Sequence, residues 1–320
     1  DLHRLIRRQR QMCIRDRAQN YMVPVIIVAL IPTVVGVLPA SELKGLTQVL
    51  PVANMVILTR ALLVEDVIPW SSVVIVLCST LVYAAASIAL AARLFGQEAV
   101  IFADSASYRS LLTRRWLVPR DRPSAALALL LTACLLPVCF HLQNSLHASQ
   151  PQLSPARLCL LVIATAGICT LAPLLLAIYA RINLRITFCL RLPPGRFWLA
   201  GLLIGLSSWL IAQRIISLQS RIWPLPEPVL QADQALQAVI ARLGPLAALA
   251  LLGLVPALSE EMLFRGFLLS GLRSSMGKQT AIAASAAIFS AFHILPYRFA
   301  ITFALGVVFA QLCWQANSVF

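Results

Sequence analysis

Two adjacent acids and an arginine interrupt a segment that is otherwise apolar. Glu260, Glu261 and Arg265 lie within residues 246–272. An ionised side chain at the centre of a bilayer costs ~2.5–3.5 kcal/mol on insertion scales, so such residues rarely occur there without a function. From Gly244 to the end of the sequence these two glutamates are the only acidic residues. The pair is therefore the first candidate for acid–base chemistry.

Helical spacing gives the two glutamates different surroundings. Residues four apart share a face of an α-helix, so Glu261 and Arg265 are neighbours and can form an ion pair. Glu260 points ~100° away from Glu261 and has no partner in its own helix. We therefore expect Arg265 to neutralise Glu261. Glu260 is left to take a proton from water and to give it to a leaving group.

A histidine in the following apolar segment supplies a second candidate group. Phe289 and His293 are four residues apart and share a helix face. Across a helical hairpin His293 can approach Glu260, and we expect the two to hold one water molecule between them. The sequence contains no HExxH pattern and no second histidine close to His293. It therefore predicts no tightly held zinc and requires no cofactor, and it leaves metal dependence open.

The composition is that of an integral membrane protein. Of the 320 residues 60% are hydrophobic and 12% are charged, whereas soluble domains carry about 25% charged residues. The formal net charge of +14 comes from basic residues in short loops, as on the cytoplasmic side of membrane proteins, so we expect no nucleic-acid partner. The eight cysteines form no CxxC pair and predict neither a disulfide framework nor a thiolate zinc site.

Apolar runs predict an all-α, polytopic membrane bundle with about eight transmembrane helices. The expected spans are residues 21–38, 70–94, 125–142, 158–179, 197–211, 246–272, 280–295 and 299–315. Residues 41–69 are too polar for a span and are expected to be re-entrant or interfacial, and residues 213–244 are expected to form a loop. The lysine and arginine bias places 96–123 and 181–196 in the cytoplasm.

The acidic and histidine motifs together resemble those of the CPBP, or Abi, family. EExxxR occurs as Glu260–Arg265 and FxxxH as Phe289–His293, in the family's order on consecutive apolar segments. The family includes type II CAAX prenyl endopeptidases as well as bacteriocin-processing and immunity proteins. The resemblance extends over residues 125–320.

What the resemblance implies is an intramembrane peptidase that uses a glutamate-activated water. Glu260 would be the general base and His293 would assist it. Glu261 and Arg265, with Phe289, would support the site.

A third family motif, a histidine four residues before Asn or Asp, is absent. Asn317 is preceded at that spacing by Cys313. We therefore expect either that the chain is cut short before this motif or that it is a catalytically inactive relative.

The first third of the sequence resembles a different family. Residues 50–54, 83–86 and 93–98 are similar to the end of a NatB-like ABC transporter permease. This predicts a permease-like domain over residues 1–110 and a protease domain over residues 120–320. No GxxxxGK[ST] loop occurs, so a permease would need a separate ATPase subunit. Residues 1–17 are expected not to be native protein, because 12–17 resemble translated adapter sequence.

The leading interpretation is thus a bacterial plasma-membrane endopeptidase that cleaves a peptide or protein within the lipid bilayer and is linked to a transporter permease. Two alternatives stay open. One is a transporter subunit in which Glu260 and Glu261 relay ions or protons. The other is an immunity-type or scaffold protein in which the two acids are structural.

Overall fold

The protein is helical throughout the part that its computed structural model describes. The described residues are 30, 32–34, 36, 38, 41–64, 68–95, 118–148, 154–222, 224, 227–293 and 296–319. Within them the structure contains no strand, only an isolated bridge between Arg120 and Ile182. The chain divides into two compact units, Asp1–Thr80 and Leu81–Phe320, and the division falls inside helix α3. The predicted all-α architecture is confirmed.

The smaller unit is built on one short helix and the start of a long one. Its described elements are η1 (Gly45–Gln48), α2 (Ala53–Val64) and the first part of α3 (Trp70–Phe95). α2 has 12 residues, too few to cross a bilayer. The expected boundary loop, residues 96–123, lies mostly outside the described residues, so the domain boundaries stay a prediction.

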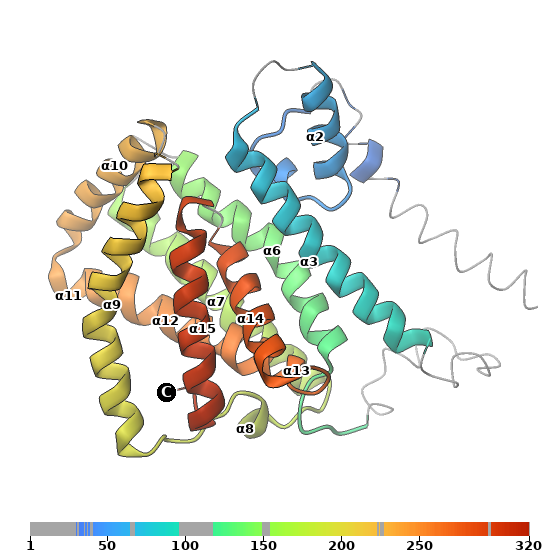
Figure 1. Ribbon diagram of the computed structural model, residues 1–320, viewed down its shortest axis with the longest axis vertical. Coiled ribbons are helices and arrows are strands. Elements are labelled where there is room, and N and C mark those ends of the chain that lie inside the picture. Colours follow the sequence, from blue (N-terminus) through green and yellow to red (C-terminus); the bar gives the residue numbers. More distant parts are fainter. Residues whose placement is uncertain are drawn as a thin grey trace, which may run out of the picture. The chain divides into compact units, whose positions relative to one another are not determined.

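The larger unit is a bundle that includes a long composite helix (Figure 1), the second half of which is buried. Its helices are α6 (Ala125–Ala148), α7 (Pro155–Tyr179), α8 (Leu184–Thr187), α9 (Gly195–Ile222), α10 (Glu227–Leu243), α14 (Lys278–Phe292), η5 (Pro296–Arg298) and α15 (Phe299–Ala316). The composite helix consists of α11 (Pro245–Ala248), η3 (Leu249–Leu254), α12 (Val255–Glu260), η4 (Glu261–Leu268) and α13 (Leu269–Leu272). η3 and η4 are π-helical. We call Pro245–Leu272 the rod.

Six helices in the described part are long and apolar enough to span a membrane. They are Trp70–Ala92, Ala125–Ser145, Pro155–Tyr179, Gly195–Arg221, Pro245–Leu272 and Phe299–Ala316, and each corresponds to a predicted span. The span predicted at 280–295 is α14, which has only 15 residues and buries much of its length against other helices. The span predicted at 21–38 lies largely outside the described residues.

The loop predicted at 213–244 is wrong. α9 continues to Ile222, and α10 follows after a break that contains Pro224. α10 forms because its apolar residues recur at helical spacing. Its side chains Leu236, Val239, Ile240 and Leu243 pack against Leu158, Val162 and Leu252. Pro228 lies in the first turn of α10, where the missing N–H costs nothing.

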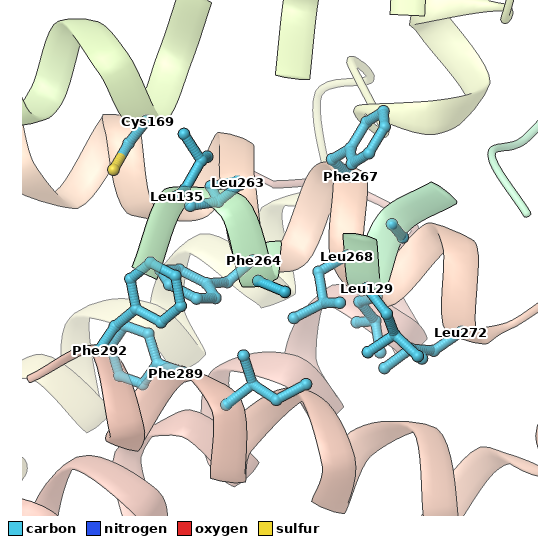
Figure 2. Close-up of a cluster of buried hydrophobic side chains, with 14 of the residues drawn as sticks. Leu129, Leu135, Cys169, Leu263, Phe264, Phe267, Leu268, Leu272, Phe289 and Phe292 are labelled. Atoms are coloured by element: carbon cyan, nitrogen blue, oxygen red, sulfur yellow. The ribbon is translucent and has the colours of Figure 1, made fainter. Parts of the chain in front are cut away.

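The core of the larger unit surrounds η4, as Figure 2 shows. Leu263, Phe267 and Leu268 are fully buried, and η4 packs against α6, α7 and α14. Gly266 permits this close packing, since a Cβ there would lie 2.7 Å from Phe188 Cδ1. Gly306 has the same effect between α15 and α14, where a Cβ would lie 3.1 Å from Ala286 Cα. The segment that follows the two acids is thus enclosed by other helices of the unit.

Candidate active site

Glu260 and Glu261 stand where the rod changes its helix type. α12 ends at Glu260, and the π-helical η4 begins at Glu261. π-helical turns in α-helices frequently occur at functional sites. Ser285 of α14 donates a hydrogen bond to the Phe264 carbonyl oxygen at 3.4 Å. The π-helical turn is therefore tied to the helix that carries the histidine motif.

Glu261 and Arg265 form the ion pair that their spacing predicts. Arg265 Nη1 lies 3.3 Å from Glu261 Oε1, and the side chains are 1% and 25% exposed, respectively. Arg265 Cζ also lies 4.2 Å from the ring centroid of Phe289. Within the described part of the chain, Arg265 Nη1 and Nη2 make no hydrogen bond. A buried guanidinium is thus balanced by one carboxylate and by an aromatic face.

Glu260 faces a cavity instead. The cavity has a volume of about 430 Å³ and is bounded by α6, α7, α9, α10, α12 and the end of α14, with η4 and η5 contributing to its wall. Glu260 and His293 both line it, whereas Glu261 and Arg265 do not. In the residues that the structure describes, no hydrogen bond or ion pair joins Glu260 to His293. The structure therefore brings the two groups to the wall of one cavity from different helices.

His293 is held by the end of its own helix. It is the C-terminal cap of α14, and its Nδ1 lies 2.9 Å from the Phe289 carbonyl oxygen. A carbonyl oxygen only accepts, so Nδ1 carries the hydrogen in this contact, and in the neutral form of the ring Nε2 is then an acceptor. The imidazole also packs edge-on against the Phe289 ring, with centroids 4.5 Å apart. Phe289 thus contacts both His293 and Arg265.

A group of aromatic rings sets the position of η4 relative to α14 (Figure 2). Phe264 packs edge-on against Phe289 and against Phe292, with ring centroids 5.1 Å apart in both pairs. Gln143 of α6 donates a hydrogen bond to the Phe292 carbonyl oxygen at 3.2 Å. Glu260 and His293 therefore belong to helices whose separation is fixed by packing, as a preorganised site requires.

Part of the cavity wall was missed by the sequence interpretation. α10 contributes Val229, Leu230, Asp233 and Leu236, all from the segment predicted as a loop. Asp233 Oδ1 lies 3.5 Å from Arg298 Nη2, and Arg298 lines the cavity too. The spacing of apolar residues after Pro228 is a signal that could have identified α10. No sequence signal connects Asp233 with Arg298, which are 65 residues apart.

Cys313 and Asn317 occupy the spacing of the absent third motif, and they lie away from the cavity. Cys313 Sγ is 4.0 Å from the Arg265 carbonyl oxygen. Asn317 Oδ1 accepts hydrogen bonds from Arg273 Nη1 at 3.4 Å and from Cys189 Sγ at 3.7 Å. Neither residue lines the space that Glu260 and His293 share. Among the described residues, no group of three or more His, Cys, Asp or Glu side chains is placed to hold a metal ion.

Comparison with known proteins gives a match for the C-terminal part of the chain. Residues 242–320 match the family described as type II CAAX prenyl endopeptidase Rce1-like. The matched segment includes the rod from its start, α14 and α15, and hence both motifs. No curated protein and no solved structure matches the chain. This part of the chain is thus similar to an intramembrane protease domain.

Proposed function

We propose that the chain is an intramembrane endopeptidase in which Glu260 activates a water molecule with the help of His293. The Rce1-like match of residues 242–320 supports the reaction class. The observation that carries the assignment of roles is the shared cavity, into which Glu260 and His293 project from different helices. The cavity is large enough for water and for part of a peptide.

In the proposed reaction the water lies between Glu260 and His293. The Glu260 carboxylate accepts a proton from it, while His293 Nε2 accepts a hydrogen bond from its other hydrogen and orients it. The water oxygen attacks the peptide carbonyl carbon and a tetrahedral intermediate forms. Glu260 then passes its proton to the amide nitrogen, and the C–N bond breaks. Glu261 and Arg265 support this arrangement by fixing the rod behind Glu260.

The two substitutions that test the proposal are Glu260→Gln and His293→Ala. Each should abolish cleavage, because the first removes the proton acceptor and the second removes the group that orients the water. General acid–base groups contribute about 10²–10⁴-fold to a rate. The purified chain would be given fluorescence-quenched peptides in micelles, each in a farnesylated and an unprenylated form. The farnesylated and unprenylated arms report whether the substrate must carry a lipid.

Matched controls separate loss of chemistry from loss of fold. Glu227→Gln and His141→Ala change the same residue types at exposed positions of α10 and α6, and both should leave the rate unchanged. Gel filtration and circular dichroism show whether each variant is folded. Cleavage at the wild-type rate by a folded Glu260→Gln variant would remove Glu260 from the mechanism.

For the N-terminal part we propose a link to transport in a bacterial plasma membrane. The support is the sequence resemblance of residues 50–54, 83–86 and 93–98 to a NatB-like permease. A permease of this kind works with a separate ATPase, so co-purification of the chain with a nucleotide-binding subunit is the test. Purification of the chain in mild detergent without any such subunit speaks against the link and leaves the protease proposal intact.

A further inference from the structure

Two cysteine thiols touch in the wall of the cavity, and the proposed hydrolysis uses neither of them. Cys139 Sγ of α6 lies 3.8 Å from Cys169 Sγ of α7. The residues are 1% and 4% exposed, and both line the cavity that contains Glu260. Cys169 also belongs to the buried cluster drawn in Figure 2. The pair is thus shielded by protein on most sides and is reached through the cavity.

We propose that Cys139 and Cys169 are an oxidative modification site. A hydroperoxide that enters the cavity converts the two thiols into a disulfide, and the disulfide inactivates the proposed active site. The chemical part of the proposal, formation of the bond, is independent of what the protein hydrolyses. The consequence for activity rests on the proposed function.

The reaction balances with hydrogen peroxide as the oxidant. One thiol, as its thiolate, attacks a peroxide oxygen; the O–O bond breaks, one water leaves, and a sulfenic acid forms. The second thiol attacks the sulfenic sulfur, the S–O bond breaks, and a second water leaves as the S–S bond forms. The two sulfurs lose two electrons in total, and the peroxide oxygens gain them. A carboxylate on the same cavity, Glu260, is available to take the proton from the attacking thiol.

Formation of the disulfide affects the helices that support Glu260 and His293. The sulfurs must approach from 3.8 Å to about 2.05 Å, so both side chains must turn toward each other, and the new bond then ties α6 to α7 at this level. Gln143 lies one helical turn after Cys139 and donates its hydrogen bond to the Phe292 carbonyl beside His293. α12, which carries Glu260, packs directly on α7. Both helices that the bond ties together therefore support a proposed reacting group, and we expect the bond to displace the two groups relative to each other.

The same two helices offer matched control cysteines. Cys134 is an exposed residue of α6, and Cys159 is a partly exposed residue of α7. Neither lines the cavity. Their thiols meet an oxidant at the protein surface, whereas those of Cys139 and Cys169 meet it inside.

The first experiment measures the bond itself. The purified full chain in micelles would be treated with hydrogen peroxide, quenched with catalase, alkylated with N-ethylmaleimide, and digested for mass spectrometry. A peptide pair linked through Cys139 and Cys169 should appear and should disappear after phosphine reduction. The Cys134→Ser/Cys159→Ser variant should give the same linked pair, and Cys139→Ser should give none. Assigning the linked peptides distinguishes a Cys139–Cys169 bond from a bond formed by any other two cysteines. Separate alkylation or over-oxidation of Cys139 and Cys169, without a link, would overturn the proposal.

The second experiment measures cleavage before and after peroxide. The wild-type rate should fall by about a hundredfold, the size of loss that follows a misplacement of ~1 Å, and reduction should restore it. Cys169→Ser should keep its own untreated rate in peroxide. If the Cys139–Cys169 disulfide forms and the cleavage rate does not change, the claim that the bond inactivates the site is overturned. Absence of cleavage before treatment counts against the proposed function instead, and the linked-peptide result stands by itself.

Discussion

Buried polar side chains occur both in the smaller unit and in the rod, and their hydrogen bonds are arranged differently. In the smaller unit Asn54 is fully buried. Its Nδ2 donates to Ser79 Oγ at 3.0 Å and to Thr80 Oγ1 at 3.1 Å, and its Oδ1 accepts from the Met55 backbone at 2.8 Å. In the rod, Arg265 is equally buried but leaves its Nη atoms without hydrogen bonds in the described structure. Glu260, five residues before it, faces a cavity.

The difference separates polar groups that hold helices together from polar groups that are available for chemistry. Partners on α2 and α3 use both donor hydrogens of the Asn54 amide and one acceptor position of its oxygen, so the amide adds specificity to the packing. In the rod, the described structure gives the Glu261–Arg265 pair and the Glu260 carboxylate no further hydrogen-bond partners. Groups of this kind cost stability, and functional sites are where proteins retain them.

The largest effect is expected from breaking the ion pair of the rod. Glu261→Gln leaves the Arg265 guanidinium buried without a counter-charge, which should cost about 3–5 kcal/mol of unfolding free energy. The value should lie at the lower end, because the Glu261 side chain is 25% exposed. Unfolding by sodium dodecyl sulfate, followed by circular dichroism, measures it.

The control for this prediction removes both charges. Glu261→Gln with Arg265→Met should recover most of the loss, because no uncompensated ion remains. If the single variant is as stable as Glu227→Gln, the guanidinium does not depend on Glu261 and the contrast between the two regions is lost.

An intermediate effect is expected from the closed network of the smaller unit. Asn54→Ala leaves the Ser79 and Thr80 hydroxyls without the amide and should cost about 1–3 kcal/mol. Peptide cleavage by the folded variant should be unchanged, since the network has no role in the proposed reaction. Stability and cleavage rate are measured on the same preparation. Asn54→Leu with Ser79→Ala, which removes both partners, should be closer to wild type. A loss of cleavage in folded Asn54→Ala would show that the two regions do not divide into support and chemistry.

The smallest effect is expected from an exposed ion pair in the smaller unit. Lys44 Nζ lies 2.8 Å from Glu42 Oε2, and this hydrogen bond, with the attraction of the ammonium, holds the pKa of Glu42 below its ordinary value of 4.5. A carboxyl with a lowered folded pKa stabilises the fold above its unfolded pKa and loses that contribution as pH falls through the folded pKa. Glu42→Gln should therefore leave stability at pH 7 within error and flatten the acid limb below pH ~4.5 only slightly. The flattening should vanish in high salt, because both side chains are well exposed.

An effect comparable with that of Glu261→Gln would contradict the distinction between exposed and buried pairs.

Sequence reasoning reached the features that depend on local spacing. The ion pair of Glu261 with Arg265, the positions of six spans and the all-α architecture each follow from periodicity or apolar length. α10 was missed because prolines and charged residues lower the hydropathy of residues 213–244, although the apolar face of the helix is regular. The contact of Cys139 with Cys169 depends on how α6 packs on α7, and the pairing of Asp233 with Arg298 on how α10 meets η5. Nothing in one chain segment encodes such contacts. The roles of Glu260 and His293 stay predictions.

The π-helical stretch at Glu261–Leu268 affects how this motif can be compared between proteins. Its hydrogen bonds close over five residues instead of four, so it accommodates about one residue more per turn than an α-helix. Deleting one residue there would restore regular winding and leave the residues on either side facing nearly as before, whereas the same deletion in a regular α-helix rotates one side by ~100° relative to the other. A related protein that lacks one residue there could therefore keep its first glutamate in the cavity wall, although the spacing between the motif letters differs. For this segment, the helix face on which a motif residue lies is a better guide to equivalent function than the number of residues between the motifs.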